Sequence, residues 1–260
     1  GGYGADIAFR SMQDPRLDEK IKTTNKPFAT AEVLKAALRI GAASVQLSHI
    51  QLGAWASPDE PGFGDGPLFA DYILFQYGVI LDPETGKRFV NELGDRKQSA
   101  DALLRIGHPC IGIADQRAVT RSGWDISKAI RKGVVRCFDS LDALAGHYGM
   151  NSDGVRASVH RYNGFVQQGV DDDFGKPIVR DAAPIAEAPF HAMRLWPKVH
   201  FTMGGLSVNT EAQVLDVDGR PIGGLYAAGE VVGGVHGASR LGSCAITECI
   251  VFGRIAGKNV

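Results

Sequence analysis

The feature that most restricts how this chain can fold is a glycine-rich segment, residues 229–246, with the sequence GEVVGGVHGASRLGSCAI. It follows an apolar stretch, 225–228, and precedes a segment, 245–258, with the pattern of a helix. A strand, a glycine loop and a helix in this order direct free backbone N–H groups toward an anion or an electron-rich ring oxygen. An acidic residue at the strand end, here Glu230, is of the type that binds ribose hydroxyls. The segment favours a nucleotide-binding α/β fold, and the alternative is a glycine-rich crossover without a ligand.

The composition agrees with such a fold and excludes two other classes of protein. Glycine accounts for 33 of the 260 residues, roughly twice the usual share of ~7 %. The 28 Lys and Arg residues balance 29 Asp and Glu residues, without a block of like charge. A protein that follows nucleic-acid phosphates is therefore not expected. No apolar run approaches the ~20 residues of a membrane-spanning helix, so a membrane span is not expected either.

The four cysteines, Cys110, Cys137, Cys244 and Cys249, form no CxxC pair. Four cysteines in a chain of this length are too few for a disulfide framework. We expect free, buried thiols and no metal site.

Hydrophobic spacing predicts a series of helices and short strands. Residues 53–70 are rich in glycine, proline and aromatic residues and predict a long loop, which is commonly functional. A hairpin is expected over 78–90, and a β-meander over 202–228. The predicted helices are 30–42, 152–167 and 245–258, and the predicted strands are 44–50, 111–114, 134–138 and 190–196.

Two further motifs carry charged or aromatic groups. The sequence VHFTMGG occupies residues 199–205, and GKRFVNELGDR occupies residues 86–96. Taken alone, His200 is more simply a structural histidine, and the second motif is more simply a solvated hairpin face.

In combination, the motifs HxTMGG, GLYxAGE, GGVHGAxRLG and GKRFVNE…R resemble the flavoprotein subunits of the fumarate reductase family, and within it the urocanate-reducing members. The 3-ketosteroid dehydrogenases share the glycine-rich part. The resemblance implies a mixed α/β fold: a discontinuous, Rossmann-like FAD-binding domain (residues 1–49 and 202–260) with an inserted α+β clamp domain (residues 50–201). The GxGxxG unit of the family is absent from residues 1–60, so we expect a C-terminal part of a longer FAD-binding unit. A further domain carrying FMN or haem is compatible with the family.

The same resemblance implies FAD as cofactor. Glu230 is expected at the ribose, and the backbone of residues 241–246 is expected to face the flavin ring. The expected FAD-binding residues are Gly204, Gly205, Gly229, Glu230, Leu241, Ser243, Ala245 and Ile246.

For catalysis, the resemblance implies Arg96 as proton donor and Asp71 as the carboxylate that pairs with it. His200 and Arg240 are expected to bind the substrate carboxylate, with Thr202 beside them. Hydride addition to an α,β-unsaturated acid builds negative charge on that carboxylate, so cationic groups there stabilise the transition state more than the ground state. Arginine is an unusual acid because its pKa exceeds ~12, and a neighbouring carboxylate must resupply its proton.

The sequence departs from the family at the position of a second substrate carboxylate. Ala70 stands where fumarate reductases have a threonine, and Leu74 stands where they have a proton-relay arginine. The stretch 52–57, LGAWAS, lacks the expected histidine. A ring could stack on Trp55, with Asp59 or Asp71 accepting an imidazole N–H. We therefore expect urocanate rather than fumarate as substrate; an aryl acrylate, and Trp55 as a plain core residue, stay open.

The overall prediction is a flavin-dependent ene-reductase that acts on an unsaturated acid and receives electrons from a donor protein or domain. The alternatives are a fumarate or aryl-acrylate reductase, a steroid-type flavin dehydrogenase, and a non-catalytic fragment with an incomplete flavin site. The chain opens Gly1-Gly2-Tyr3-Gly4, without an initiator Met or a signal peptide, and we expect a processed or partial chain. Respiratory members of the family work in the periplasm, which is all that the resemblance implies about location.

Overall fold

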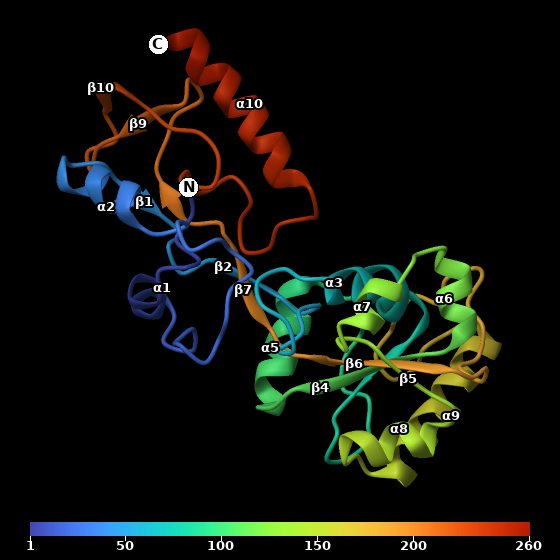
Figure 1. The fold of residues 1–260 in the computed structure, drawn as a ribbon. Helices are drawn as coiled ribbons and strands as arrows, with labels where there is room; N and C mark the ends of the chain where they lie inside the picture. The colour runs from blue at the N-terminus through green and yellow to red at the C-terminus, as the bar shows by residue number, and fades with distance from the viewer. The chain divides into compact units, whose positions relative to one another are not determined.

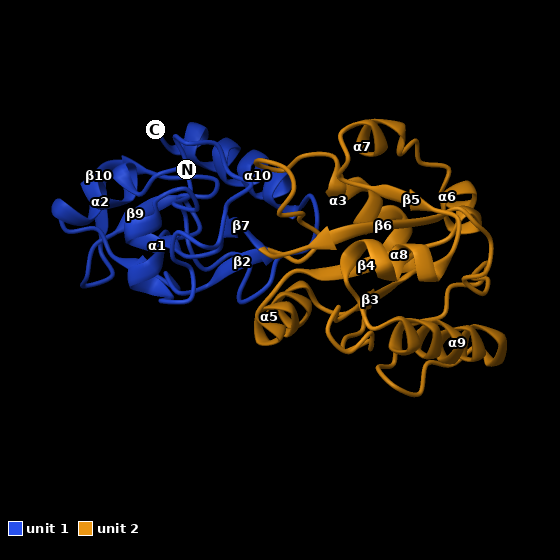
Figure 2. Cartoon of the chain, turned by 60° about the horizontal axis from the view of Figure 1, so that its bottom comes forward, with its two compact units in different colours: residues 1–52, 198–260 blue, residues 53–197 orange.

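The computed structural model describes residues 1–260 and divides them into two compact units. Unit 1 consists of residues 1–52 and 198–260, and unit 2 of residues 53–197 (Figure 2). From the sequence, we expected the inserted domain to run from residue 50 to residue 201. Both units combine helices with short strands (Figure 1), which confirms the predicted mixed α/β class.

Unit 2 is organised by an antiparallel sheet with the strand order β3-β4-β6-β5. Its strands are β3 (Val79–Leu81), β4 (Cys110–Ala114), β5 (Arg136–Phe138) and β6 (Phe190–Leu195). Every residue of β4 is buried, as expected for a central strand covered on both faces. The register pairs Ile111 with Arg194 and Ala192 with both Ile113 and Arg136. This register decides which side chains share a face of the sheet.

Two helices, α8 (Leu141–Tyr148) and α9 (Ser152–Gln168), cover one face of this sheet (Figure 1). The buried side chains of α9 recur at helical spacing: Val155, Val159, Tyr162 and Phe165. They pack with Ile111 and Ile113 of β4 in one core cluster. Asn151 caps the start of α9 and Gly169 ends it in the left-handed conformation. The helix predicted over 152–167 is thus confirmed.

The opposite face of the sheet is covered by the chain that follows the predicted loop 53–70. The predicted loop 53–70 is helical at its end, where α3 (Gly66–Phe69) begins. This helix runs into a π-helical turn, η1 (Ala70–Leu74), and then into α4 (Phe75–Tyr77). Gly112 permits the close approach, since a Cβ there would lie 2.2 Å from Leu74 Cδ2. The remaining helices of unit 2 are α5 (Arg96–Ile106), α6 (Gln116–Ser122) and α7 (Ser127–Arg131).

Unit 1 is built from short two-stranded pairings and three helices. The strand predicted over 44–50 is divided in two, because Gln46 has a positive φ of 54°. The helix predicted over 30–42 is shorter, with Ala31 rather than Thr30 at its N-cap. The helices are α1 (Ile7–Gln13), α2 (Glu32–Arg39) and α10 (Cys244–Asn259), and the strand pairs are β1 (Ser44–Val45) with β8 (Gly205–Leu206), β2 (Ile50–Gly53) with β7 (Lys198–Thr202), and β9 (Gln213–Leu215) with β10 (Pro221–Tyr226).

A buried arginine organises the first 21 residues of unit 1. The Arg10 guanidinium donates hydrogen bonds to the carbonyl oxygens of Gly4 (2.7 Å), Leu17 and Asp18 (2.9 Å each), and also to that of Ile21. Burial lowers its pKa, with the Asp18 carboxylate opposing this effect. These four carbonyl oxygens thus accept hydrogen bonds from a side chain, where a helix or sheet would supply backbone N–H groups.

All four cysteines are free, as predicted, but only Cys110 is buried; Cys137 and Cys249 are exposed. Cys244 is half-buried, so the expectation of buried thiols is confirmed for Cys110 alone. None of the helices combines the length and the apolar character that crossing a membrane requires.

Candidate active site

One cavity in unit 2, of about 310 Å³, brings together three residues selected from the sequence: Trp55, Asp71 and Arg96. Asp71 lies on the π-helical turn η1, and Arg96 is the first residue of α5. The other lining residues are mainly apolar or small: Ala54, Tyr72, Phe75, Leu93, Gly94 and Ser99, together with Glu92. Arg96 is the single cationic side chain among them.

The position of Arg96 follows from the way α5 begins. The Asp95 carboxylate caps the helix by accepting hydrogen bonds from the N–H groups of Lys97 (2.8 Å) and Gln98 (3.4 Å). Arg96 therefore starts the helix at the mouth of the cavity, half-buried. On the other side, η1 presents Asp71 through a π-helical turn, a distortion that is frequent at functional sites.

Asp71 and Arg96 interact through space rather than by a hydrogen bond. Burial raises the pKa of Asp71 to about 6, and the positive charge of Arg96 opposes this rise. A carboxyl group with such a pKa exchanges its proton readily near neutral pH. The pair can thus hold a proton and pass it on.

The two apolar departures from the family lie in the core and not on the cavity wall. Ala70 and Leu74 are completely buried. Leu74 packs on Gly112 of strand β4 and on Gly78, which directly precedes strand β3. The position that the resemblance assigns to a relay arginine is therefore filled by hydrocarbon, and no ionisable group continues from Asp71 in that direction.

Trp55 is both a core residue and a cavity wall, so the two readings of it made from the sequence are compatible. It is 2 % exposed, and its ring lies 5.1 Å from that of Phe63, tilted by 56°. Gly53 allows the indole to lie against the backbone, because a Cβ there would come within 2.7 Å of the ring. The ring is therefore held in one orientation.

Asp59 lies elsewhere in unit 2. Its carboxylate is held by Arg194, with 3.1 Å from Nε to each oxygen and 2.5 Å from Nη2 to Oδ1. It lines a different cavity from that of Trp55, Asp71 and Arg96. A ring N–H would have to compete with Arg194 for this carboxylate, so Asp71 is the better-placed acceptor beside Trp55.

In unit 1, Arg240 stacks on the residue that follows His200 in β7. The Arg240 guanidinium carbon lies 4.4 Å from the centroid of the Phe201 ring, and its Nη1 donates to the carbonyl oxygen of Leu241 (2.8 Å). His200 Nδ1 lies 2.8 Å from the hydroxyl of Thr24. His200 and Arg240, the two residues predicted to bind the substrate carboxylate, therefore lie in the same part of unit 1. Phe201 connects them, because it follows His200 in β7 and contacts the Arg240 guanidinium.

Glu230 is half-buried beside Thr202. Its Oε1 accepts hydrogen bonds from the Thr202 N–H (2.9 Å) and hydroxyl (3.2 Å). Burial raises the pKa of Glu230, and the two Thr202 hydrogen bonds oppose this rise. Oε2 makes no hydrogen bond in the structure, so it can accept one from a ribose hydroxyl. Thr202, which we expected near the substrate, contacts this carboxylate.

The predicted glycines serve close backbone contacts. A Cβ at Gly204 would lie 2.1 Å from the Gln46 carbonyl oxygen, and one at Gly205 would lie 2.2 Å from that of Val231. Gly229 has a positive φ of 78°. These positions exclude side chains for reasons of packing, which explains the glycine motif without requiring that each glycine touch the flavin.

The start of α10 has the properties required of a flavin-binding element. Ser243, at the N-cap, has a positive φ of 65°, and no side chain caps the helix. Leu241 and Ile246 expose 78 % and 64 % of their surface, which is unusual for large apolar side chains. A helix start that no side chain caps, beside exposed apolar surface, fits a planar ring with electron-rich oxygens. Together with the open oxygen of Glu230, the residues present fit FAD.

Several residues of these two regions were not predicted from the sequence. Tyr72 and Phe75 line the cavity, and the position of Phe75 four residues after Asp71 on a helical segment is the signal that could have identified it. Glu92 lies within the GKRFVNE motif, four residues before Arg96. In unit 1, His236 Nε2 lies 2.7 Å from Glu248 Oε2, a buried pair that ties the glycine loop to α10.

Comparison with known proteins defines the family. A family described as "FAD binding domain" matches residues 1–246, so the chain belongs to this family of FAD-binding flavoproteins, and its cofactor is FAD. It is 43 % identical over 264 residues to the acrylate reductase flavoprotein subunit of Shewanella woodyi, which covers 99 % of this chain. It is 31 % identical over 266 residues to the urocanate reductase of Eggerthella lenta, which covers 100 % of it.

Among solved structures, the open conformation of a flavocytochrome c3 fumarate reductase matches with a TM-score of 0.77 at 31 % identity, over 100 % of this chain and 44 % of that one. The predicted family is confirmed; similarity to the acrylate reductase exceeds that to the urocanate reductase, so the narrower prediction stays a prediction. The chain spans about half the length of these relatives: 52 % of the acrylate reductase subunit and 43 % of the urocanate reductase.

Proposed function

We propose that the protein reduces the C=C bond of a short α,β-unsaturated monocarboxylate, with bound FAD supplying the hydride. The observation that carries this proposal is the wall of the cavity beside Asp71 and Arg96. Arg96 is its one cation, and Trp55, Tyr72 and Phe75 form its aromatic side. A second substrate carboxylate would meet apolar surface there, without a cation to offset its loss of hydration.

The proposed class is acrylate and its 3-substituted derivatives. Urocanate, the substrate favoured by the sequence analysis, is the imidazolyl member of this class, and cinnamate is the phenyl member. The aromatic wall supports a ring substituent, and the similarity to an acrylate reductase subunit supports an acid without one. Fumarate is disfavoured in either case because it carries the second carboxylate.

In this proposal, the residues of the chain have separate tasks. Arg240 and His200 bind the substrate carboxylate, where negative charge builds as the β-carbon accepts hydride. Arg240 suits this task because its guanidinium is fixed on Phe201. Arg96 then donates a proton to the α-carbon, and Asp71 returns a proton to Arg96.

The resupply of protons to Asp71 differs from the family pattern. Because Leu74 fills the relay position with hydrocarbon, we propose that water in the cavity of about 310 Å³ delivers the proton. The pKa of Asp71, raised by burial to about 6, allows the carboxylate to accept a proton from water and release it again at neutral pH.

The test is the anaerobic oxidation of a reduced viologen dye by the FAD-loaded protein. Acrylate, urocanate, cinnamate and fumarate are offered separately, and kcat/KM is compared. We expect one of the three monocarboxylates to exceed fumarate by about tenfold or more, a difference of ~1.4 kcal/mol. Fumarate as the preferred substrate would overturn the proposal. A protein that retains FAD but oxidises no dye with any of the four acids would refute the reaction itself.

A further inference from the structure

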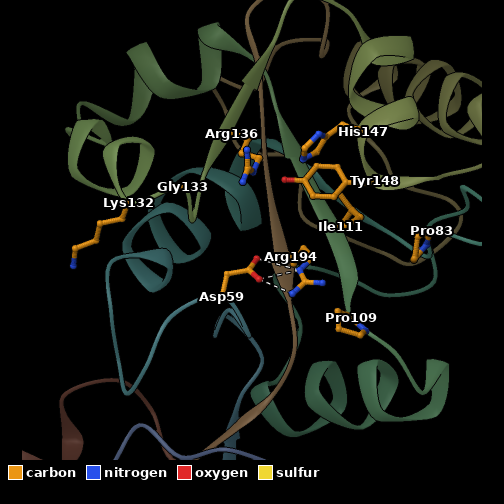
Figure 3. Close-up of a pocket in the computed structure, with 10 residues that line it drawn as sticks. All are labelled: Asp59, Pro83, Pro109, Ile111, Lys132, Gly133, Arg136, His147, Tyr148 and Arg194. Atoms are coloured by element: carbon orange, nitrogen blue, oxygen red, sulfur yellow. Dashed lines mark hydrogen bonds and ion pairs between the residues drawn. The ribbon is translucent and has the colours of Figure 1, made fainter.

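We infer that unit 2 contains a second ligand site, a binding site for a small organic monocarboxylate held by Arg136 and Tyr148. The site is a cavity of about 570 Å³ (Figure 3). It shares no lining residue with the cavity of Asp71 and Arg96. The inference is therefore independent of the proposed reaction.

The strand register places two arginines on the same face of the sheet. Arg136 of β5 is paired with Ala192 of β6, and Arg194 lies two residues further along β6. Residues two apart in a strand share a face, and diagonal neighbours on adjacent strands are ~7–8 Å apart. Ala192 belongs to the core cluster under α8 and α9, so both arginines lie on that side of the sheet. The cavity opens where α8 ends, at His147 and Tyr148.

The charges of the cavity leave one positive charge without a partner. Asp59 neutralises Arg194 through three hydrogen bonds. Lys132 shares the Asp65 carboxylate with Lys128, and its side chain points away from the other groups in Figure 3, so it does not face the centre of the cavity. The Arg136 side chain makes no ion pair or hydrogen bond in the structure, although its backbone belongs to the β5–β6 ladder. A ligand with a single negative charge balances this site, whereas a doubly charged one would exceed it.

The donors converge on one point. Figure 3 shows the Arg136 guanidinium and the Tyr148 hydroxyl pointing toward each other across the cavity, above the Asp59–Arg194 pair. Burial raises the pKa of Tyr148 to about 12, with the Arg136 charge opposing this rise, so the hydroxyl keeps its proton and can donate it. A guanidinium and a phenol O–H can bind the two oxygens of one carboxylate.

The other walls suit the apolar body of an organic acid. Tyr148 is fixed by edge-on contacts with His147 (ring centroids 4.8 Å apart) and Phe138 (5.8 Å). Ile111, Pro83 and Pro109 form the apolar remainder. The cavity is larger than an inorganic anion requires, and such an ion would bury little of the apolar surface of these residues. The geometry therefore favours an acid with a hydrocarbon or aromatic body over free phosphate.

The test uses benzoate as the probe, with neutral benzamide and inorganic phosphate as comparisons. Binding is followed by NMR on the ¹⁵N-labelled protein. We expect saturable benzoate-dependent shifts of the backbone amides of β5 and of the end of α8. Benzamide should give none, and phosphate should bind more weakly than benzoate. Absence of saturable shifts in β5 and α8, or tighter binding of phosphate, would overturn the assignment.

Two variants make the test specific to the site. Arg136→Gln removes the charge, and Tyr148→Phe removes the hydroxyl; Arg136 is exposed on an edge strand, so its replacement leaves the core intact. Arg136→Gln should weaken benzoate binding about tenfold or more, and Tyr148→Phe by a smaller factor. Arg96→Gln, in the other cavity, should leave the β5 shifts and their affinity unchanged. Unchanged affinity in Arg136→Gln, or its loss in Arg96→Gln, would refute the site.

Discussion

Lys176 Nζ and Glu92 Oε2 lie 3.5 Å apart, with both side chains completely shielded from water. Glu92 also receives hydrogen bonds from Arg88 Nε (3.1 Å) and Nη2 (2.8 Å) and from the N–H of Ile80 (3.0 Å). Lys176 donates in addition to the carbonyl oxygen of Gly78 (2.6 Å). This charge cluster fixes the segment that leads to Arg96 against strand β3. It contributes to the candidate site by holding the segment that leads to the start of α5.

Removal of either partner should destabilise the protein, and removal of the carboxylate should cost more. Burial lowers the pKa of Lys176 to about 8, with the Glu92 charge opposing this effect, so Lys176 is charged at neutral pH. Glu92→Ala leaves that charge buried without its carboxylate, at a cost of about 3–5 kcal/mol in the free energy of unfolding. Lys176→Met leaves Glu92 with Arg88 and should cost only about 1–3 kcal/mol. Denaturant titration measures both.

The control for this pair is Lys97, which is paired with Asp101 on the exposed side of α5. Lys97→Ala should change the free energy of unfolding by less than about 0.5 kcal/mol, because exposed ion pairs contribute little. Equal effects of Glu92→Ala and Lys97→Ala would contradict the role assigned to the buried cluster.

Asp71→Asn should stabilise the protein at neutral pH while impairing turnover. Burial raises the pKa of Asp71 from 3.8 to about 6, so between these values the folded state binds more protons than the unfolded state. The free energy of unfolding therefore falls as pH rises through this window, and the penalty persists above it. Asn carries no charge, so the gain in Asp71→Asn should be small near about pH 4 and reach about 1–2 kcal/mol at about pH 8.

Thermal unfolding of the variant and the native protein across this pH range is the measurement. Asp139→Asn, at an exposed bend, is the matched control and should change thermal stability little, because its side chain is exposed. A stabilisation by Asp71→Asn that is the same at both ends of the range would show that burial of the charge is not its cause.

The parts of the fold that the sequence predicted are those in which local pattern and tertiary packing agree. The helix α9 has a clear apolar stripe, an Asn cap and a terminal Gly, so its limits follow from residues within it. The strand β4 is a short apolar run bounded by polar residues, and its burial on both faces requires that composition. The family motifs likewise identified Asp71 and Arg96, which the structure brings to one cavity.

The parts that the sequence could not predict depend on partners distant in the chain. Asp59 was assigned to a ring N–H, but its partner in the structure is Arg194, 135 residues away. Arg10 satisfies backbone carbonyls of an irregular segment, for which no periodic pattern exists. The π-helical turn that presents Asp71 packs through Leu74 against Gly112, a contact that intrinsic propensity does not indicate. In each case, tertiary contact decides what local pattern leaves open.

Arg96→Gln should abolish turnover without releasing FAD. The side chain lies in the cavity of unit 2, whereas the groups that fit FAD, Glu230 and the start of α10, belong to unit 1. Loss of a positioned acid lowers kcat by about 10²–10⁴-fold. Steady-state kinetics with the preferred acid, together with the flavin absorbance per protein, measure the two effects. Arg105→Gln, at the exposed end of the same helix, should change neither; a turnover in Arg96→Gln close to the native value would remove Arg96 as the acid.

Trp55 should determine the preference for a monocarboxylate. Trp55→His places a hydrogen-bonding and potentially cationic ring on the cavity wall beside Asp71, where it can bind a second carboxylate. A hydrogen bond to a charged group contributes about 1.5–3 kcal/mol, so the ratio of kcat/KM for fumarate to that for acrylate should rise about tenfold or more. The ratio should rise further as the pH is lowered toward the pKa of an ordinary histidine, ~6.5.

Trp55→Phe separates this effect from the loss of packing. Both variants remove volume from a side chain that is 2 % exposed, so both should lower the free energy of unfolding, and FAD content must be measured for each. Only Trp55→His adds a polar group, and only that variant should gain activity on fumarate. If the two variants show the same substrate ratio, the apolar wall does not exclude the second carboxylate, and the basis for preferring acrylate-type acids over fumarate is removed. If fumarate turnover rises in Trp55→His alone, the polarity of this one position accounts for the difference from a fumarate-reducing site.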